Sequence, residues 1–212
     1  MLIFDIGANI GNWSIENYKF FLNTTNSPNT IISVEGSEDT FNILCDNIKD
    51  IKNIIPLNYV VSSSKDTYIT FYECIFNTLS TTNIEWLTNE KSRFNKQAYS
   101  EKKIKVISID RMIEQYGKPD LIKIDVEAGE YDCIKSLSTK VDTLCFEWAS
   151  EMIDVTFNCL DYLYNLGFRK FYIQNNDDYL FRPNEYNLDI NKTKELLSLM
   201  KPKIDWGMIW CQ

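Results

Sequence analysis

The stretch FDIGANIGNWS, residues 4–14, decides the fold class of this chain of 212 residues. The apolar run LIFDI at 2–6 predicts a buried strand, and glycines at 7 and 11 predict a tight turn into a helix. A strand that ends in glycine and leads into a helix is typical of an open parallel sheet, in which ligands bind beyond the carboxyl ends of the strands. The stretch therefore predicts a small-molecule site close to residue 7.

The rest of the chain alternates short apolar runs with longer helical patterns. The predicted strands are 2–6, 30–35, 57–62, 121–126, 143–148, 169–174 and 206–211, and the predicted helices are 11–24, 38–49, 111–116, 130–138, 154–166 and 192–201. This rotation predicts an α/β fold with a mostly parallel, doubly wound sheet, whose last two strands form an antiparallel edge pair.

Residues 63–109 interrupt the alternation. Two further strand patterns, 67–73 and 104–109, flank a polar segment that contains Phe76, Trp86, Phe94 and Tyr99. A long irregular segment in a compact domain is usually a functional loop. We therefore expect a single domain over 1–212 with an inserted hairpin and a substrate loop at 63–109. These aromatic rings, together with Trp13, are expected either to stack on a sugar or a cofactor or to pack against each other. The stretch NTLSTTN (77–83) either offers hydroxyls and amides to a polyol acceptor or is a plain polar loop.

Composition excludes several functions. A net charge of -8 without a dense cluster of Lys and Arg argues against a nucleic-acid partner. No apolar run approaches the roughly 20 residues of a spanning helix, and the N-terminus is not a signal peptide, so we expect no membrane partner. Six scattered cysteines indicate reduced thiols and a cytoplasmic protein. The Asn-, Ile- and Lys-rich composition indicates an AT-rich genome, such as that of a virus or a parasite, so the cytoplasm can be that of a host or a virus. The absence of histidine excludes a histidine base and histidine-bound zinc.

The first turn departs from the dinucleotide fingerprint, because Asn9 stands where G-x-G-x-x-G needs its second glycine. Asp5 would repel a diphosphate and pair with a cationic ligand such as a sulfonium. Glu35, at the end of the next strand, would accept hydrogen bonds from ribose hydroxyls. A cationic, phosphate-free nucleoside satisfies both residues, and S-adenosylmethionine is such a ligand. The alternative is that Asp5 caps the helix and the glycines only shape the turn.

A second acidic group lies in DLIKIDVEAGEYDCIKSL, residues 120–137. Lys123, inside an apolar strand, is expected to form a structural ion pair with Asp125 or Asp5. Asp125 and Glu127 follow at the carboxyl end of the strand, where they would face the ligand. Glu130 is expected either to cap the next helix or to have a role in the site.

FDIGANIGNWS, SVEGSEDTFNILCDNI, SIDRMI and DLIKIDVEAGEYDCIKSL resemble, in order, the motifs of the FkbM family of S-adenosylmethionine-dependent methyltransferases, over about residues 3–148. The resemblance implies a Rossmann-like class I methyltransferase fold and methylation of a hydroxyl on a sugar or other metabolite. The cofactor-binding residues that it implies are Asp5, Gly7, Ala8, Asn9, Gly11, Glu35, Ser62 and Asp125.

The chain also departs from the family pattern. It has EAGE at 127–130 where the family usually has EGAE, and Gly36 where the family usually has proline. It also begins directly at its first strand, whereas relatives commonly carry preceding helices, so the covering of the substrate side and association into a homodimer stay open.

An alcohol acceptor must lose its proton, and without histidine the candidates are carboxylates. Asp125 is the first candidate for the base, with Glu127 and Glu147 as further catalytic candidates. Alternatively, Asp125 and Glu147 hold a Mg²⁺ ion that acidifies the hydroxyl. Two other functions compete with methyl transfer to a glycan or metabolite: a nicotinamide-dependent oxidoreductase of related fold, and a catalytically inactive interaction module.

Overall fold

In the computed structural model, which describes residues 1–25 and 29–212, seven strands form one sheet in the order β3-β2-β1-β7-β8-β10-β9. Their bounds are β1 Leu2–Ile6, β2 Thr30–Glu35, β3 Ile54–Asn58, β7 Leu121–Ile124, β8 Thr143–Ala149, β9 Phe171–Asn175 and β10 Trp206–Cys211. β10 is antiparallel to both β8 and β9, and the other neighbours are parallel. The predicted mostly parallel sheet and the antiparallel pair of last strands are both confirmed.

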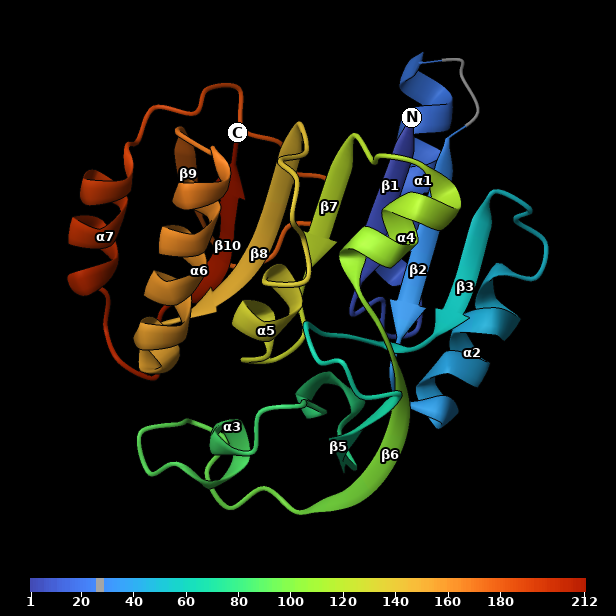
Figure 1. The fold of residues 1–212 in the computed structure, drawn as a ribbon, viewed down its shortest axis with the longest axis horizontal. Helices are drawn as coiled ribbons and strands as arrows, with labels where there is room; N and C mark the ends of the chain where they lie inside the picture. The colour runs from blue at the N-terminus through green and yellow to red at the C-terminus, as the bar shows by residue number, and fades with distance from the viewer. Residues whose placement is uncertain (26–28) are drawn as a thin grey trace.

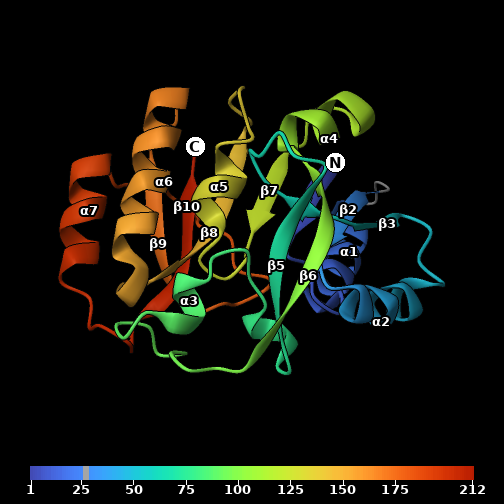
Figure 2. The ribbon, with the colours of Figure 1, turned by 60° about the horizontal axis from the view of Figure 1, so that its bottom comes forward.

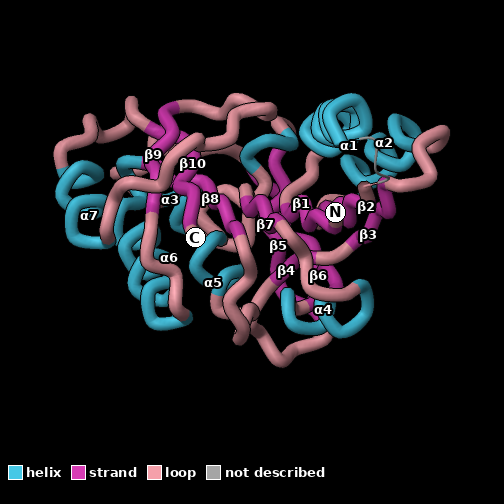
Figure 3. Tube along the Cα trace, turned by 90° about the horizontal axis from the view of Figure 1, so that it is seen from above, coloured by secondary structure: helices cyan, strands magenta, loops and turns pink. Residues whose placement is uncertain are grey.

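Helices cover both faces of this sheet (Figure 3). One face carries α1 (Asn12–Thr25) and α2 (Glu38–Ile48), and the other carries α4 (Ile109–Tyr116), α5 (Glu130–Ile134) and α6 (Ile153–Leu166). α7 (Ile190–Ser198) packs against α6 and the edge strand β9. None of the helices within 1–25 and 29–212 combines the length and apolarity that crossing a bilayer requires.

The hydrophobic core is split by the sheet because strand side chains alternate between its faces. Phe4 and Ile6 of β1 are buried in the cluster beneath α5 and α6, whereas Ile3 belongs to the cluster beneath α1 and α2. Asp5 therefore points, like Ile3, toward the α1 face, and it is fully buried.

A smaller sheet lies at the carboxyl ends of the parallel strands (Figure 1). It consists of β4 (Val60–Val61), β6 (Tyr99–Ile107) and β5 (Tyr68–Cys74), and β5 and β6 pair antiparallel as the predicted inserted hairpin. The connection between them contains two short helices, η1 (Asn77–Leu79) and α3 (Glu85–Thr88). Figure 2 shows α3 and this hairpin in front of the strand ends, so the insertion covers the edge at which ligands bind in such folds.

Several boundaries differ from the sequence-based prediction. The third strand was expected at 57–62, but β3 spans Ile54–Asn58 and contains Pro56, which pairs with Ser33. Proline is tolerated there because β3 is an edge strand with one pairing neighbour. The second strand of the hairpin starts at Tyr99 rather than at 104, and a short 3₁₀ helix, η2 (Ser150–Met152), follows β8.

The turn after β1 requires glycine at position 7. Gly7 has φ +77°, and an added Cβ would lie 1.7 Å from the backbone oxygen of Asp125. We expect Gly7→Ala to lower the free energy of unfolding by about 3 kcal/mol, because a backbone atom cannot move aside as a side chain can. Gly167→Ala is the matched control, since Gly167 has φ +112° but its Cβ would meet only Lys140 Cδ at 3.6 Å.

The control should cost about 1 kcal/mol, the usual penalty for a side chain at positive φ. Denaturant unfolding of both variants measures the difference. Equal losses would mean that the close approach of Gly7 to Asp125 contributes nothing of its own.

Candidate active site

A cavity of about 370 Å³ opens at the carboxyl ends of β1, β2 and β7. Its floor is the turn after β1, and the hairpin and η1 form the opposite wall. Residues of both the turn and the strand ends line it, among them Gly7, Ala8, Asn9, Trp13, Glu35, Val60, Phe71, Thr78, Lys123, Asp125, Glu127, Glu147, Asp177, Tyr179 and Trp206. The position agrees with the ligand site that the first strand and turn predict.

The backbone amides of the turn are engaged within the protein. Gly7 and Ala8 donate to Val34 O at 3.0 and 2.9 Å, and Gly11 donates to Ala8 O at 2.9 Å. The Asn9 amide donates to Glu35 Oε2 at 2.9 Å, and the Ile10 amide donates to Asn9 Oδ1 at 2.7 Å. A pyrophosphate is normally bound by free amides at this point, and all five amides of residues 7–11 already have partners.

Glu35 lies between this turn and α2. Its carboxylate accepts from the amides of Asn9 and Ser37, at 2.9 and 2.8 Å. Burial raises the pKa of Glu35 to about 7, although these two amides favour the charged form. The Glu35 carboxyl keeps its proton to higher pH in the folded protein than in the unfolded chain. The free energy of unfolding therefore falls as the pH rises from about 4.5 to 7.

Lys123 is a buried cation at the centre of the site. Its Nζ lies 3.2 Å from Asp5 Oδ1 and 3.3 Å from Asp125 Oδ2, and it donates to Gly7 O at 2.9 Å. Burial alone would lower the pKa of Lys123, but Asp5 and then Asp125 outweigh it, so the pKa is raised and the amine stays charged. The expected structural ion pair is confirmed, with both carboxylates as partners.

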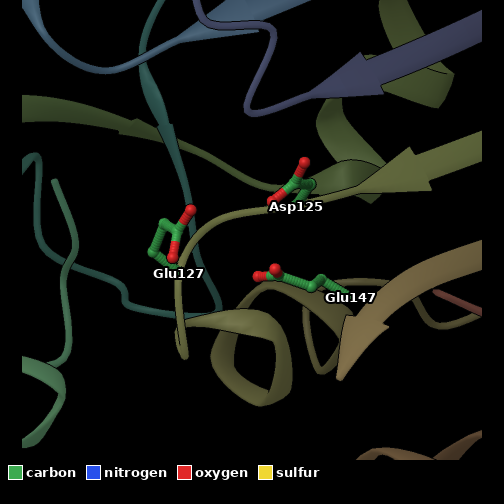
Figure 4. A group of neighbouring side chains, drawn as sticks. All are labelled: Asp125, Glu127 and Glu147. Atoms are coloured by element: carbon green, nitrogen blue, oxygen red, sulfur yellow. The ribbon is translucent and has the colours of Figure 1, made fainter. Parts of the chain in front are cut away.

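Three carboxylates converge where the cavity passes β7 and β8 (Figure 4). Asp125 follows β7, Glu127 lies in the next turn and Glu147 is in β8; one oxygen of each lies within 4.8 Å of the others. Burial, and then repulsion among these acids, raises the pKa of both Glu127 and Glu147 well above the usual range. The geometry thus permits the three residues to hold a metal ion, but the expected Mg²⁺ stays a prediction.

The turn that holds Glu127 has an unusual backbone. Glu127 and Ala128 have φ of +55° and +65°, in the left-handed region that favours glycine. Gly129 instead has φ -94° and is the N-cap of α5, and the Glu130 carboxylate accepts from the Val126 amide at 3.1 Å. Glu130 therefore fixes the turn that precedes α5, and its expected capping role and its expected role in the site both stay predictions.

Residues 81–83, which belong to the insertion, form contacts with this turn. Thr81 Oγ1 donates to Glu127 O at 2.5 Å, and Asn83 Nδ2 donates to Ala128 O at 3.0 Å. A Cβ at Gly129 would lie 2.9 Å from Thr82 Oγ1. In the stretch 77–83, which was predicted to bind a polyol, Thr81 and Asn83 thus form hydrogen bonds within the protein. Thr78 and Thr82 of the same stretch line the main cavity.

A second cavity, of about 270 Å³, lies beneath the insertion. It shares Thr78, Glu127, Glu147 and Trp206 with the main cavity, and its other lining residues are Leu79, Trp86, Arg93, Phe94 and Ala149. Arg93 fixes the insertion here by donating to both carboxylate oxygens of Glu151, at 2.5 and 2.7 Å. The two cavities therefore meet at the acidic residues.

Not every predicted site residue reaches a cavity. Gly7, Ala8, Asn9, Glu35, Asp125, Glu127 and Glu147 line the main cavity, and Trp13, Trp86 and Phe94 line one of the two. Asp5 instead accepts from Ser14 Oγ at 2.6 Å and pairs with Lys123, and Ser62 donates to Asp132. Gly11 packs against α2, where a Cβ would lie 2.5 Å from Leu44 Cδ1. Phe76 is 63% exposed, and Tyr99 packs edge-on against Tyr72.

The sequence prediction missed three residues that line the main cavity far from the motifs: Asp177, Tyr179 and Trp206. Burial, and then repulsion by Asp125, raises the pKa of Asp177 to about 6. The acidic pair that follows β9, Asp177 and Asp178, is the signal that could have indicated a role, because it follows a strand of the same sheet.

Sheet order, helix placement and a site at the carboxyl edge define a class I methyltransferase fold. A precorrin-6y C5,15-methyltransferase from Geobacter metallireducens has a similar structure, with a TM-score of 0.50 at 11% identity over 100% of this chain and 80% of that one. The model of the methyltransferase FkbM domain matches residues 5–170. The chain therefore belongs to the FkbM family of S-adenosylmethionine-dependent methyltransferases.

Two other solved structures resemble it less closely. A methyltransferase FkbM from Methylobacillus flagellatus has a TM-score of 0.44 at 16% identity, over 76% of this chain and 36% of that one. Aeropyrum pernix fibrillarin, in complex with S-adenosyl-L-methionine, has a TM-score of 0.46 at 10% identity, over 100% of this chain and 65% of that one. No curated protein matches the sequence.

Removing the buried cation tests the energetics of the site. We expect Lys123→Met to lower the free energy of unfolding by about 3–5 kcal/mol, because it leaves the buried Asp5 without its counter-charge. The double variant Asp5→Asn with Lys123→Met should regain part of this loss. Urea unfolding provides the measurement, with the exposed Lys91→Met as control. A loss below about 1 kcal/mol for Lys123→Met would contradict a structural role for the ion pair.

Proposed function

We propose that the chain is an S-adenosylmethionine-dependent O-methyltransferase that acts on a hydroxyl of a sugar or a sugar-containing metabolite. One observation carries the cofactor assignment: the amides of residues 7–11 are all engaged, while Glu35 and Asp125 line the same cavity. That arrangement suits a nucleoside that is cationic and carries no phosphate.

The residues present fit this cofactor. Gly7, Ala8 and Asn9 would hold it along the floor of the cavity, and Glu35 would accept hydrogen bonds from the ribose hydroxyls. Val60 and Phe71 provide an apolar wall against which the adenine ring of the cofactor would lie. When bound, the cofactor supplies a methyl group on a cationic sulfur, and the nearby carboxylates favour that positive charge.

The two competing functions are less well supported. A nicotinamide dinucleotide would place its diphosphate against a turn without free amides and beside several carboxylates. An inactive interaction module has no need for three partly buried carboxylates that converge on a cavity, because their mutual repulsion costs stability.

On the acceptor side we propose Asp125 as the general base. Its side chain is 26% exposed and lines the main cavity beside Glu127 and Glu147. The acceptor hydroxyl would pass its proton to a carboxylate oxygen as the new carbon–oxygen bond forms, and the nearby ammonium of Lys123 holds that carboxylate in place. The insertion, with Thr78 and Thr82 on the cavity wall, would act as the substrate loop within a single domain over 1–212.

A small-molecule acceptor, a cytoplasmic setting, and the absence of nucleic-acid and membrane partners remain predictions from the sequence. So does association into a homodimer.

Cofactor binding can be measured by calorimetry without an acceptor. We expect S-adenosylhomocysteine to bind and NADH to give no heat. Glu35→Gln should weaken binding by about 10–100-fold, because a charged acceptor is lost and an amide N–H meets the donors at Asn9 and Ser37. Glu38→Gln, an exposed neighbour on α2, should have no effect.

The same measurement has a pH dependence. Affinity should rise from pH 6 to pH 8 and level off above the Glu35 pKa of about 7, because the ionised carboxylate is the better acceptor. Binding that Glu35→Gln leaves unchanged, or equal binding of NADH, would refute the proposed cofactor site.

Turnover distinguishes a carboxylate base from a bound metal. Asp125→Asn should lower kcat by about 100-fold or more, measured at saturating cofactor because Asp125 also lines the cofactor cavity. If Asp125 is the base, a chelator leaves activity unchanged, whereas activity lost with chelator and restored by Mg²⁺ would assign Asp125 and Glu147 to a metal. Full activity of Asp125→Asn would exclude both roles.

A further inference from the structure

We infer that the acceptor carries an ammonium group in addition to its hydroxyl, and that the second cavity binds this group between Glu127 and Glu147. The inference rests on the proposed methyltransferase function and names the class of its acceptor: a small aminated polyol, such as an amino sugar. It depends on the acidic residues that the two cavities share, the aromatic wall beside them and one buried N–H donor.

The two glutamates shared by the cavities can accept a cation. Within the described residues, none of the ion pairs includes Glu127 or Glu147. Lys123 is bound by Asp5, Asp125 and the Gly7 carbonyl. Arg93 lies near both glutamates, but both oxygens of Glu151 bind its guanidinium. Both side chains are only partly exposed, and burial and mutual repulsion raise the pKa of each. A cationic ligand that enters here would favour their charged forms and be attracted by them.

The wall of the second cavity favours an organic cation over a metal ion. Trp86 and Phe94 line it, packed edge-on with ring centroids 5.0 Å apart, and Trp206 lines both cavities. Aromatic faces attract ammonium groups, whereas Mg²⁺ and Ca²⁺ take oxygen ligands and retain water. Carboxylates beside aromatic rings are therefore matched to an amine.

Trp86 adds a buried N–H donor beside these acids. Trp86 is 3% exposed, and its Nε1–H lies beside the Glu127 carboxylate and favours the charged form of that group, but it makes no hydrogen bond of regular geometry among the described residues. A buried donor of this kind normally has a partner. A hydroxyl oxygen next to the ammonium group would provide it, which is why an aminated polyol fits better than a simple amine.

Because the two cavities are connected, one acceptor molecule can place its ammonium group in one cavity and its hydroxyl in the other. Glu127 and Glu147 belong to both cavities, whereas Asp125 lines only the larger one. An ammonium group bound by the glutamates leaves the rest of the molecule directed toward Asp125, so a hydroxyl one or two carbons away reaches the proposed base.

The test compares aminated sugars with neutral isosteres in the presence of saturating S-adenosylhomocysteine. The probes are glucosamine against glucose, and galactosamine against galactose, with N-acetylglucosamine as a nitrogen-containing neutral compound. Calorimetry near neutral pH should show at least tenfold tighter binding for one aminated member than for its neutral counterpart. The preference should disappear in Glu127→Gln and in Glu147→Gln and persist in the exposed Glu114→Gln.

Three results would overturn the inference: equal binding within every pair, no measurable binding of either aminated sugar at millimolar concentration, or a preference that survives in both glutamine variants. Tight binding of Mg²⁺ that the same two variants abolish would also overturn it. Binding of S-adenosylhomocysteine to each variant shows that the variant is folded. Absence of that binding in the unsubstituted protein would refute the proposed function itself, so the two failures are distinguishable.

Discussion

The buried ammonium of Lys123 is the interaction on which the site depends. It connects three parts of the chain that are distant in sequence: Asp5 inside β1, the Gly7 carbonyl in the first turn and Asp125 at the end of β7. One cation thereby fixes the ends of two neighbouring parallel strands relative to each other. Burial raises the pKa of Asp5, and the Lys123 ammonium opposes that rise by favouring the charged carboxylate.

From this centre the site divides into two regions with different chemistry. On the β1–β2 side the turn satisfies its own amides, and Glu35 remains as an acceptor at the cavity wall. On the β7–β8 side, acids gather under an insertion that contributes aromatic rings and hydroxyls. The first region suits recognition of a nucleoside, and the second suits a polar, positively charged partner molecule.

The sequence predicted the fold well because strand ends and turns are encoded locally. Gly7, Glu35 and Asp125 directly follow or end apolar runs, and the structure brings them together as expected. Asp5 lies outside the residues that line the cavity, because β1 continues to Ile6 and leaves the carboxylate inside the strand, where it pairs with Lys123 as the sequence also allowed. Asp177, Tyr179 and Trp206 reach the cavity from distant segments, and no local pattern predicts such an approach. Pro56 concealed the start of β3, because proline usually argues against a strand.

Ala128 and Gly129 stand in the reverse order of the glycine and alanine that the family usually has in this turn. Ala128 accepts a left-handed backbone while the glycine next to it leaves room for Thr82, and Thr81 and Asn83 hold the same turn. Insertion and turn are therefore matched surfaces that must change together. We therefore expect a chimera that takes the insertion and the turn from different relatives to lose these contacts.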